Sequence, residues 1–219
     1  MLACVGGTGQ ASPLVIAPTT IEIDQSRRSA VIQVENASDE PVDLQFRAYD
    51  WSQPDGVDTL APTRDLIVSP AIVTVAPRAK QVFRVLQVGE AGTAERSYRL
   101  KLNELPRAAD QAVGVTLEFS LPVFKTQGRA TPVIRWSAGA QGVRVANAGA
   151  RRIKLARLAV RNPDGGAMEL AEARSAYILA GAERRWAPPL GWRTLPGARL
   201  IGESDAGPID VALPAPAAG

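Results

Sequence analysis

The chain has 219 residues and a formal net charge of +3, from 25 basic and 22 acidic residues, and 46% of its residues are hydrophobic. This length suits one large β domain or two sandwiches of roughly 100 residues each, and it can bury a core without disulfides. A small, scattered positive excess does not predict nucleic-acid binding. Histidine is absent, which removes the usual general base and the commonest metal ligand. We therefore expect no metal and no cofactor.

The first twelve residues do not read as part of a fold. Residues 1–12 are small and mildly apolar, and they hold the single cysteine, Cys4, so neither a disulfide framework nor a cysteine-based zinc site is expected. They are consistent with the remnant of a signal peptide or with an unprocessed leader. No apolar run reaches the length of a membrane span, so we expect no stable membrane insertion.

Alternation of apolar and polar residues dominates the sequence that follows. It is clear in residues 31–36, 42–51, 82–88 and 98–102, and turn residues such as Gly, Pro, Asn and Asp separate these runs. Such a pattern predicts short antiparallel strands with one buried face. No long stretch has a helical period, and the best candidate, Ala167 to Ala180, fits a short helix and a strand-loop-strand equally well.

A domain boundary is predicted near residues 126–131, where a long apolar strand ends and a new alternating run begins. We expect an N-terminal domain over residues 13–125 and a C-terminal domain over residues 126–219. Asn162-Pro163-Asp164-Gly165 predicts a tight turn in the second domain. Further short strands are expected at Gly142–Ala146, Ile153–Val160, Tyr177–Leu179, Ala198–Ile201 and Ile209–Leu213.

A search for catalytic groups finds none of weight. The sequence has no Gly-rich phosphate loop, no nucleophile elbow and no carboxylate cluster at metal spacing. Asp55, Asp58 and Asp65 fall in one predicted loop, and because the order of a calcium-binding loop is missing, a solvated turn is the better interpretation.

The longest alternating run lies just before the predicted boundary. Its five large apolar residues are separated by Gly114, Thr116, Glu118 and Ser120. A last strand of this kind usually packs its apolar row into the core of its own domain, but it can also lend that row to the incomplete sheet of a partner. Periodicity alone leaves both interpretations open. The row consists of Val113, Val115, Leu117, Phe119 and Leu121.

One segment carries a family resemblance. The run Ser97-Tyr98-Arg99-Leu100-Lys101-Leu102-Asn103-Glu104-Leu105-Pro106, followed by the long alternating strand, resembles the PapD-like periplasmic pilus chaperones. Ile67-Val68-Ser69-Pro70 and Val75-Ala76-Pro77-Arg78-Ala79-Lys80-Gln81 resemble the middle strands of that family. The likeness covers roughly residues 13–126, whereas the second half matches only in size and strand pattern.

The resemblance implies an all-β protein of two consecutive immunoglobulin-like β-sandwich domains in a boomerang arrangement. It implies a periplasmic chaperone that supplies Val113 to Leu121 to a pilus subunit lacking its final strand, and then passes the subunit to an outer-membrane usher. An uncovered sheet edge on the subunit would otherwise aggregate.

The charged anchor of the best-known members is missing from this sequence. Those chaperones hold the terminal carboxylate of the subunit with an arginine of the first strand and a lysine of the donor strand, but Thr20 and Pro122 occupy the matching positions here. The form Ser97-Tyr98-Arg99-Leu100 resembles the archaic branch of the family, in which the resemblance places the anchor at Arg99. A guanidinium suits a carboxylate because it offers a planar, bidentate fork. The alternative is that Arg99 simply faces solvent.

Two other classes of function compete with this interpretation. A structural or adhesive surface protein of two immunoglobulin-like domains would share the fold, but it would use Val113 to Leu121 as a core strand. An enzyme is disfavoured because histidine and clustered carboxylates are both lacking.

Overall fold

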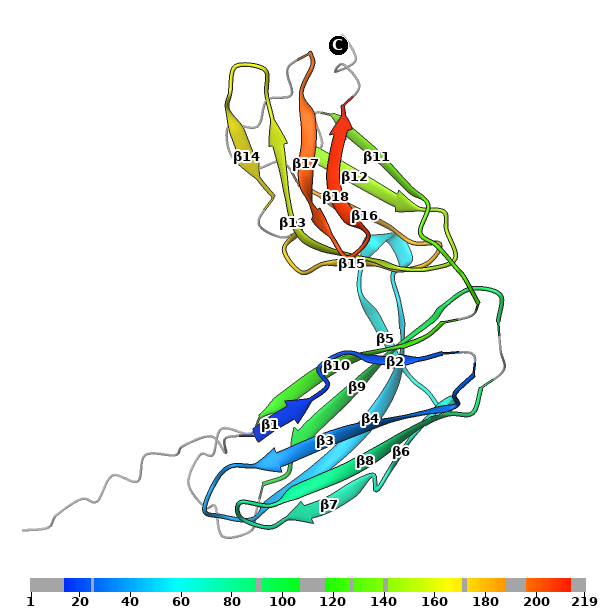
Figure 1. Cartoon of the computed structure of the whole chain (residues 1–219), viewed down its shortest axis with the longest axis vertical. Helices are drawn as coiled ribbons and strands as arrows, with labels where there is room; N and C mark the ends of the chain where they lie inside the picture. Colours follow the sequence, from blue (N-terminus) through cyan, green and yellow to red (C-terminus); the bar gives the residue numbers. More distant parts are fainter. Residues whose placement is uncertain are drawn as a thin grey trace, which may run out of the picture. The chain divides into compact units, whose positions relative to one another are not determined.

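The computed structural model describes residues 14–24, 26–89, 92–106, 117–126, 128–139, 142–170, 173–187 and 196–213. The described chain is almost entirely β-structure and includes a short 3-10 turn, η1 (Pro54–Gly56) (Figure 1). The prediction of an all-β protein is confirmed. No described helix is long and apolar enough to cross a membrane.

The first sandwich has two sheets. In one sheet the strand order is β1-β3-β8-β6, and in the other it is β2-β10-β9-β4-β5, with β7 paired to β4. The strands are β1 (Leu14–Ala17), β2 (Ile21–Ile23), β3 (Ser29–Asn36), β4 (Val42–Ser52), β5 (Thr59–Pro62), β6 (Leu66–Ser69), β7 (Ile72–Val75), β8 (Lys80–Gln87), β9 (Arg96–Glu104) and β10 (Glu118–Lys125).

The predicted alternation decides which side chains form the core of this sandwich. Successive side chains of a strand point to opposite faces, so every second residue of β3, β4, β8 and β9 faces inward. In β9, for example, Tyr98, Leu100 and Leu102 have no exposed surface, while Arg99 and Lys101 between them are half-buried on the other face. The predicted strands at residues 31–36, 42–51, 82–88 and 98–102 are therefore confirmed.

The second sandwich also has two sheets around a core of its own. One has the order β11-β12-β16, and the other has the order β14-β13-β17-β18, with β15 paired to β13. Strands β14 and β15 resolve the ambiguity over Ala167 to Ala180 in favour of a strand-loop-strand. The strands are β11 (Ile134–Gly139), β12 (Gly142–Asn147), β13 (Ile153–Arg161), β14 (Ala167–Glu169), β15 (Tyr177–Ile178), β16 (Glu183–Trp186), β17 (Arg199–Ser204) and β18 (Gly207–Ala212).

The chain divides into two compact units, each containing one sandwich. Unit 1 contains residues 1–50, 60–91 and 97–125, and unit 2 contains residues 51–59, 92–96 and 126–219. Unit 2 therefore takes two short segments from within the range of the first sandwich, and both contribute buried polar contacts to it, as described below.

A buried asparagine ends one strand in each sandwich and makes the same set of hydrogen bonds in both. Asn36 closes β3, and its Nδ2 donates to the carbonyl oxygens of Glu40, Val75 and Ala76 at 2.7, 3.1 and 3.2 Å. Its Oδ1 accepts from the N–H of Ser38 at 3.0 Å. Because the side chain satisfies several main-chain groups at once, it holds the turn after β3 against the end of β7.

Asn147 has this role in unit 2, at the end of β12. Its Nδ2 donates to the carbonyl oxygens of Arg151, Ile178 and Leu179 at 2.7, 3.2 and 3.1 Å, and its Oδ1 accepts from the N–H of Gly149 at 3.0 Å. In each case the partners are the residue four positions later and two consecutive residues at the end of another strand. We call these two arrangements the asparagine corners.

Candidate functional site

The predicted donor strand contains β10, which has different neighbours along its two edges. One edge lies along β9, and on the other edge β2 pairs in parallel with Val123–Lys125 only (Figure 1). Among the described strands, none pairs with this second edge along residues 118–122. Main-chain N–H and C=O groups on such an edge are available to another strand.

The predicted apolar row divides into two parts along this strand. Leu121 has 5% of its surface exposed and belongs to the core of unit 1, whereas Phe119 is half-buried and packs against that core. Leu117 is also half-buried. Val113 and Val115 lie outside the described residues. The interpretation of a strand packed into its own core therefore describes Leu121, whereas Phe119 and Leu117 are less covered.

Polar contacts hold the start of β10 against β9. The N–H of Glu104 donates to the carbonyl oxygen of Leu117 at 3.0 Å. On the outer face of the sheet, the Glu118 carboxylate bridges two side chains of β9, accepting from Lys101 Nζ at 2.8 Å and from Asn103 Nδ2 at 2.9 Å. The hydrogen bond from Lys101, followed by that from Asn103, lowers the pKa of Glu118, and the hydrogen bond to Glu118 raises the pKa of Lys101.

The outer face of β9 and β4 is basic. Arg99 lies on this face and pairs in register with Tyr49, while Lys101 pairs with Arg47 on the neighbouring strand. Lys101 Nζ also lies 5.9 Å from the centre of the Tyr49 ring. Arg47, Arg99 and Lys101 therefore gather within two rows of one sheet face, and Glu118 contacts Lys101. Such a face attracts anions.

The two positions at which the resemblance expected a charged pair are partly or fully buried. Thr20 is half-buried, and Pro122 is buried within β10. The nearest lysine along the strand, Lys125, is itself buried, and its Nζ donates to the carbonyl oxygens of Asp24 and Arg27 at 2.6 and 3.1 Å. Sequence reasoning missed this lysine, although its place directly after the apolar run 121–124 was a signal of burial.

The three aspartates assigned to a solvated turn have different surroundings. Asp58 is the centre of a polar cluster in unit 2, where its Oδ1 accepts from Trp51 Nε1 and Gln53 Nε2, each at 2.8 Å. Arg184 Nη1 lies 3.3 Å from its Oδ2. Asp58 is nevertheless exposed, with 43% of its side-chain surface accessible, so these contacts form at the surface of the turn. Within the described residues, no group of three His, Cys, Asp or Glu side chains could hold a metal ion.

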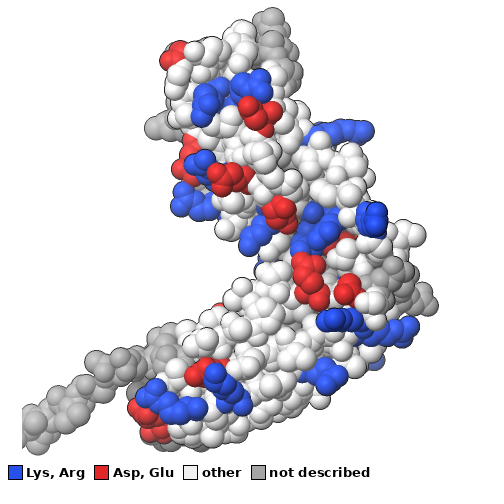
Figure 2. Space-filling view, viewed as in Figure 1, with Lys and Arg blue, Asp and Glu red and all other residues white. Residues whose placement is uncertain are grey.

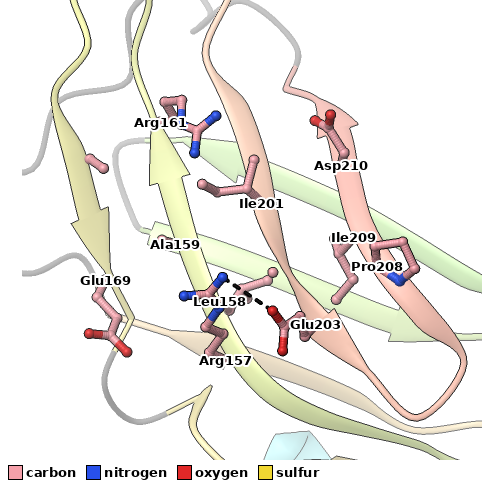
Figure 3. Close-up of a pocket in the computed structure, with 12 residues that line it drawn as sticks. Arg157, Leu158, Ala159, Arg161, Glu169, Ile201, Glu203, Pro208, Ile209 and Asp210 are labelled. Atoms are coloured by element: carbon pink, nitrogen blue, oxygen red, sulfur yellow. Dashed lines mark hydrogen bonds and ion pairs between the residues drawn. The ribbon is translucent and has the colours of Figure 1, made fainter.

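Unit 2 also has a hollow on the outer face of the sheet β14-β13-β17-β18. Its volume is about 510 Å³, and its floor includes Ala159 and Ile201 (Figure 3). The charges on its rim are largely compensated, since Arg157 pairs with Glu203 and Arg199 pairs with Asp210. Basic and acidic groups accordingly lie side by side on the face of unit 2 in Figure 2, whereas the middle of unit 1 is largely uncharged in that view.

Comparison with known proteins identifies a family with this architecture. The model of the family described as "Pili and flagellar-assembly chaperone, PapD N-terminal domain" matches residues 13–126. A search of curated protein sequences returned no match. The fold is that of two immunoglobulin-like sandwiches, as the family match and the similar solved structures show.

Three solved structures illustrate the likeness. A chain of the CsuC–CsuE chaperone–tip adhesion subunit pre-assembly complex from the archaic Csu pili of Acinetobacter baumannii is 19% identical, with a TM-score of 0.73, 92% of this chain covered and 98% of that chain. The CupB2 chaperone of Pseudomonas aeruginosa is 19% identical, with a TM-score of 0.67 and coverages of 91% and 100%. A chain of the SafA pilin–SafB chaperone complex of Salmonella enterica is 13% identical, with a TM-score of 0.71 and coverages of 94% and 99%. Because the family model matches more than half of the sequence, the chain belongs to the pili and flagellar-assembly chaperones with a PapD-type N-terminal domain.

Proposed function

We propose that this chaperone binds pilus subunits by donor-strand complementation through β10 and the residues that precede it. The observation that carries the proposal is that no described strand pairs with the second edge of residues 118–122, beside a row of alternating apolar side chains. A strand with a free edge can hydrogen-bond to the sheet of a partner, and its alternate side chains can fill apolar pockets.

The difference in burial between Leu121 and the two described residues before it indicates where the donated part ends. Leu121 is a core residue of unit 1, so it ties the strand to its own domain. Phe119 and Leu117 are only partly covered, and Val113 and Val115 continue the alternation in the sequence. We therefore assign the contact with the subunit groove to Val113, Val115, Leu117 and Phe119, with Leu121 at its boundary.

Arg99 is the proposed anchor for the terminal carboxylate of the subunit. It lies on the outer face of β9 and is half-buried. A partly desolvated arginine binds a carboxylate more strongly than an exposed one. The uncharged residues Thr20 and Pro122 support this assignment, because neither can neutralise a carboxylate.

The setting follows from the same proposal. The chaperone acts in the periplasm and passes the subunit to an outer-membrane usher. One similar structure comes from a system described as an archaic chaperone-usher pathway, and others are complexes of a chaperone with a pilin or a tip subunit. Neither the family match nor the similar structures support the alternative of a structural or adhesive surface protein.

The test changes the charge of the row. Val115→Asp and Leu117→Glu would place a carboxylate in an apolar groove, so co-purification of the one-to-one complex with the subunit should be lost. Val82→Asp is the control, because Val82 is 53% exposed on β8, in the other sheet of unit 1. All three variants should keep the circular dichroism spectrum of the unchanged protein. Complex formation that survived both row variants would refute donor-strand binding.

A further inference from the structure

We infer that Glu118 is the residue that sets the register of the donor strand against β9, and that it thereby sets the offset between the apolar row and Arg99. The inference rests on the proposed function, since it concerns how that site is positioned. Its starting point is the pair of hydrogen bonds by which one carboxylate spans Lys101 and Asn103 on the neighbouring strand.

The apolar row cannot set its own register. A slip of one residue would turn Phe119 and Leu121 away from the core, so burial opposes it strongly. A slip of two residues keeps the same face inward and merely exchanges one large apolar side chain for another. Leu117, Phe119 and Leu121 are therefore a poor guide to which of these registers forms. A different signal has to distinguish them.

Glu118 provides that signal on the opposite face. In a register shifted by two residues, Thr116 or Ser120 would take its place beside Lys101 and Asn103. Neither can accept from both side chains as a carboxylate does, because a carboxylate has two separate oxygens. The shifted register would also leave Lys101 beside Arg47 without its acidic partner, and like charges on opposite strand positions destabilise a sheet.

The other end of β10 is fixed independently. Val123–Lys125 pair with β2, and Lys125 is held by two carbonyl oxygens. Between the two ends lies Pro122, which has no N–H to donate to a strand ladder. The near end of the strand can therefore shift or bulge without breaking the far end, and Glu118 is placed where such a shift would begin.

The register matters for binding because the two parts of the site lie on different strands. Arg99 is on β9, two residues from Lys101, whereas the apolar row is on β10. A slip of two residues would move the row by about 6.7 Å relative to Arg99. If the carboxylate of the subunit stayed at Arg99, each apolar side chain of the row would then face the neighbouring pocket of the subunit groove instead of its own.

Stability alone would not reveal this role. The side chains of Lys101 and Glu118 are 28% and 45% exposed, so their ion pair contributes little to overall folding. Glu118→Ala should leave the thermal midpoint nearly unchanged. Glu203→Ala is the matched control, because Glu203 is an exposed glutamate in an ion pair with Arg157, on β17 of unit 2.

The experiment combines a direct measurement of register with a double-mutant cycle. In the free chaperone, cross-strand nuclear Overhauser contacts should connect Glu104 with Leu117, and in Glu118→Ala these contacts should weaken or move by two residues. For subunit affinity, Glu118→Ala should cost about tenfold in the unchanged background but less than about twofold in an Arg99→Ala background. Glu118→Gln, which can still accept one of the two hydrogen bonds, should fall between.

The outcomes separate this inference from the proposed function. Unchanged cross-strand contacts in Glu118→Ala, or losses of affinity that simply add to those of Arg99→Ala, would overturn the positioning role while leaving donor-strand binding intact. If Arg99→Ala alone had no effect on affinity, the anchor would be wrong. If Val115→Asp had no effect either, donor-strand binding itself would be wrong.

Discussion

The carboxylate of Glu95 and the guanidinium of Arg152 form a buried ion pair in unit 2, with 2.5 Å between Oε2 and Nη1. Their side chains are 0% and 5% exposed. The main-chain N–H of Arg152 also donates to Glu95 Oε1 at 3.1 Å, and the Thr126 hydroxyl donates to Oε2 at 3.0 Å. A buried carboxylate is tolerated here because both of its oxygens are satisfied.

Removing one member of this pair should be costly. Glu95→Ala leaves the Arg152 charge buried without its partner, so we expect a loss of about 3–5 kcal/mol in the free energy of unfolding. Urea denaturation followed by tryptophan fluorescence would measure it. Arg157→Ala, which breaks the exposed pair with Glu203, should cost less than about 1 kcal/mol. Similar losses in the two variants would contradict the argument from burial.

Asp58 should make unit 2 sensitive to acid. Burial raises the pKa of Asp58, but hydrogen bonds from Gln53 and Trp51 and the charge of Arg184 outweigh burial, and the pKa lies below the ordinary value of 3.8. Because the folded pKa is below the unfolded one, the ionised group stabilises the fold above the unfolded value, and this contribution is lost as pH falls through the folded pKa.

The matching measurement compares the unchanged protein with Asp58→Asn across pH. The variant should be less stable to urea at pH 7, and the difference should shrink as pH falls below about 4. A difference that stayed constant down to pH 3 would show that the charge of Asp58 is not what stabilises the cluster.

Lys125 should stabilise unit 1 through its ammonium group. Lys125→Met keeps an unbranched side chain of similar reach but leaves the Asp24 and Arg27 carbonyl oxygens without this donor, so we expect a loss of about 1–3 kcal/mol. Lys80→Met is the control, since Lys80 forms a largely exposed pair with Glu35. Thermal unfolding followed by circular dichroism would compare them. Equal thermal midpoints for the two variants would mean that the buried hydrogen bonds of Lys125 contribute nothing to the stability of unit 1.

The two asparagine corners should act separately on their own units. Asn36→Ala and Asn147→Ala each remove a donor to three carbonyl oxygens, at a cost of roughly 2–4 kcal/mol. All four tryptophans fall within the residue ranges of unit 2. Asn147→Ala should therefore lower the unfolding midpoint measured by tryptophan fluorescence. Asn36→Ala should instead lower the midpoint measured by circular dichroism, because unit 1 then unfolds before unit 2. A fluorescence midpoint lowered equally by both would show that the corners do not act on separate units.

The sequence predicted those features that depend on local alternation. Strands β3, β4, β8 and β9 could be read directly because one face of each is buried and the other is polar, and the turn at Asn162–Gly165 could be read from its residue types. The strand-loop-strand over Ala167 to Ala180 could not be chosen over a helix, because β14 and β15 are too short to show a period of two.

The features that the sequence did not predict depend on contacts between residues that are far apart in the chain. The contact of Asp58 with Arg184 could not be predicted, because these two residues are far apart in the sequence and meet only on folding. The role of Glu118 could not be predicted either. In the sequence it is one polar residue between apolar neighbours, and its bridge to Lys101 and Asn103 exists only once β10 lies on β9. Periodicity identified the row itself but could not show that Leu121 is buried while Leu117 is less covered.

The pairing of β2 with the end of β10 has a consequence for the order of folding. Ile21–Ile23, near the start of the chain, pair with Val123–Lys125, about a hundred residues later. Contacts of such long range form slowly, because a large loop must close before they stabilise anything. β2 can therefore pair only after the chain between residues 23 and 123 has brought β10 to it. The strand that completes this sandwich is therefore also the one proposed to serve the subunit, so a molecule with its donor strand in place has finished folding its first domain.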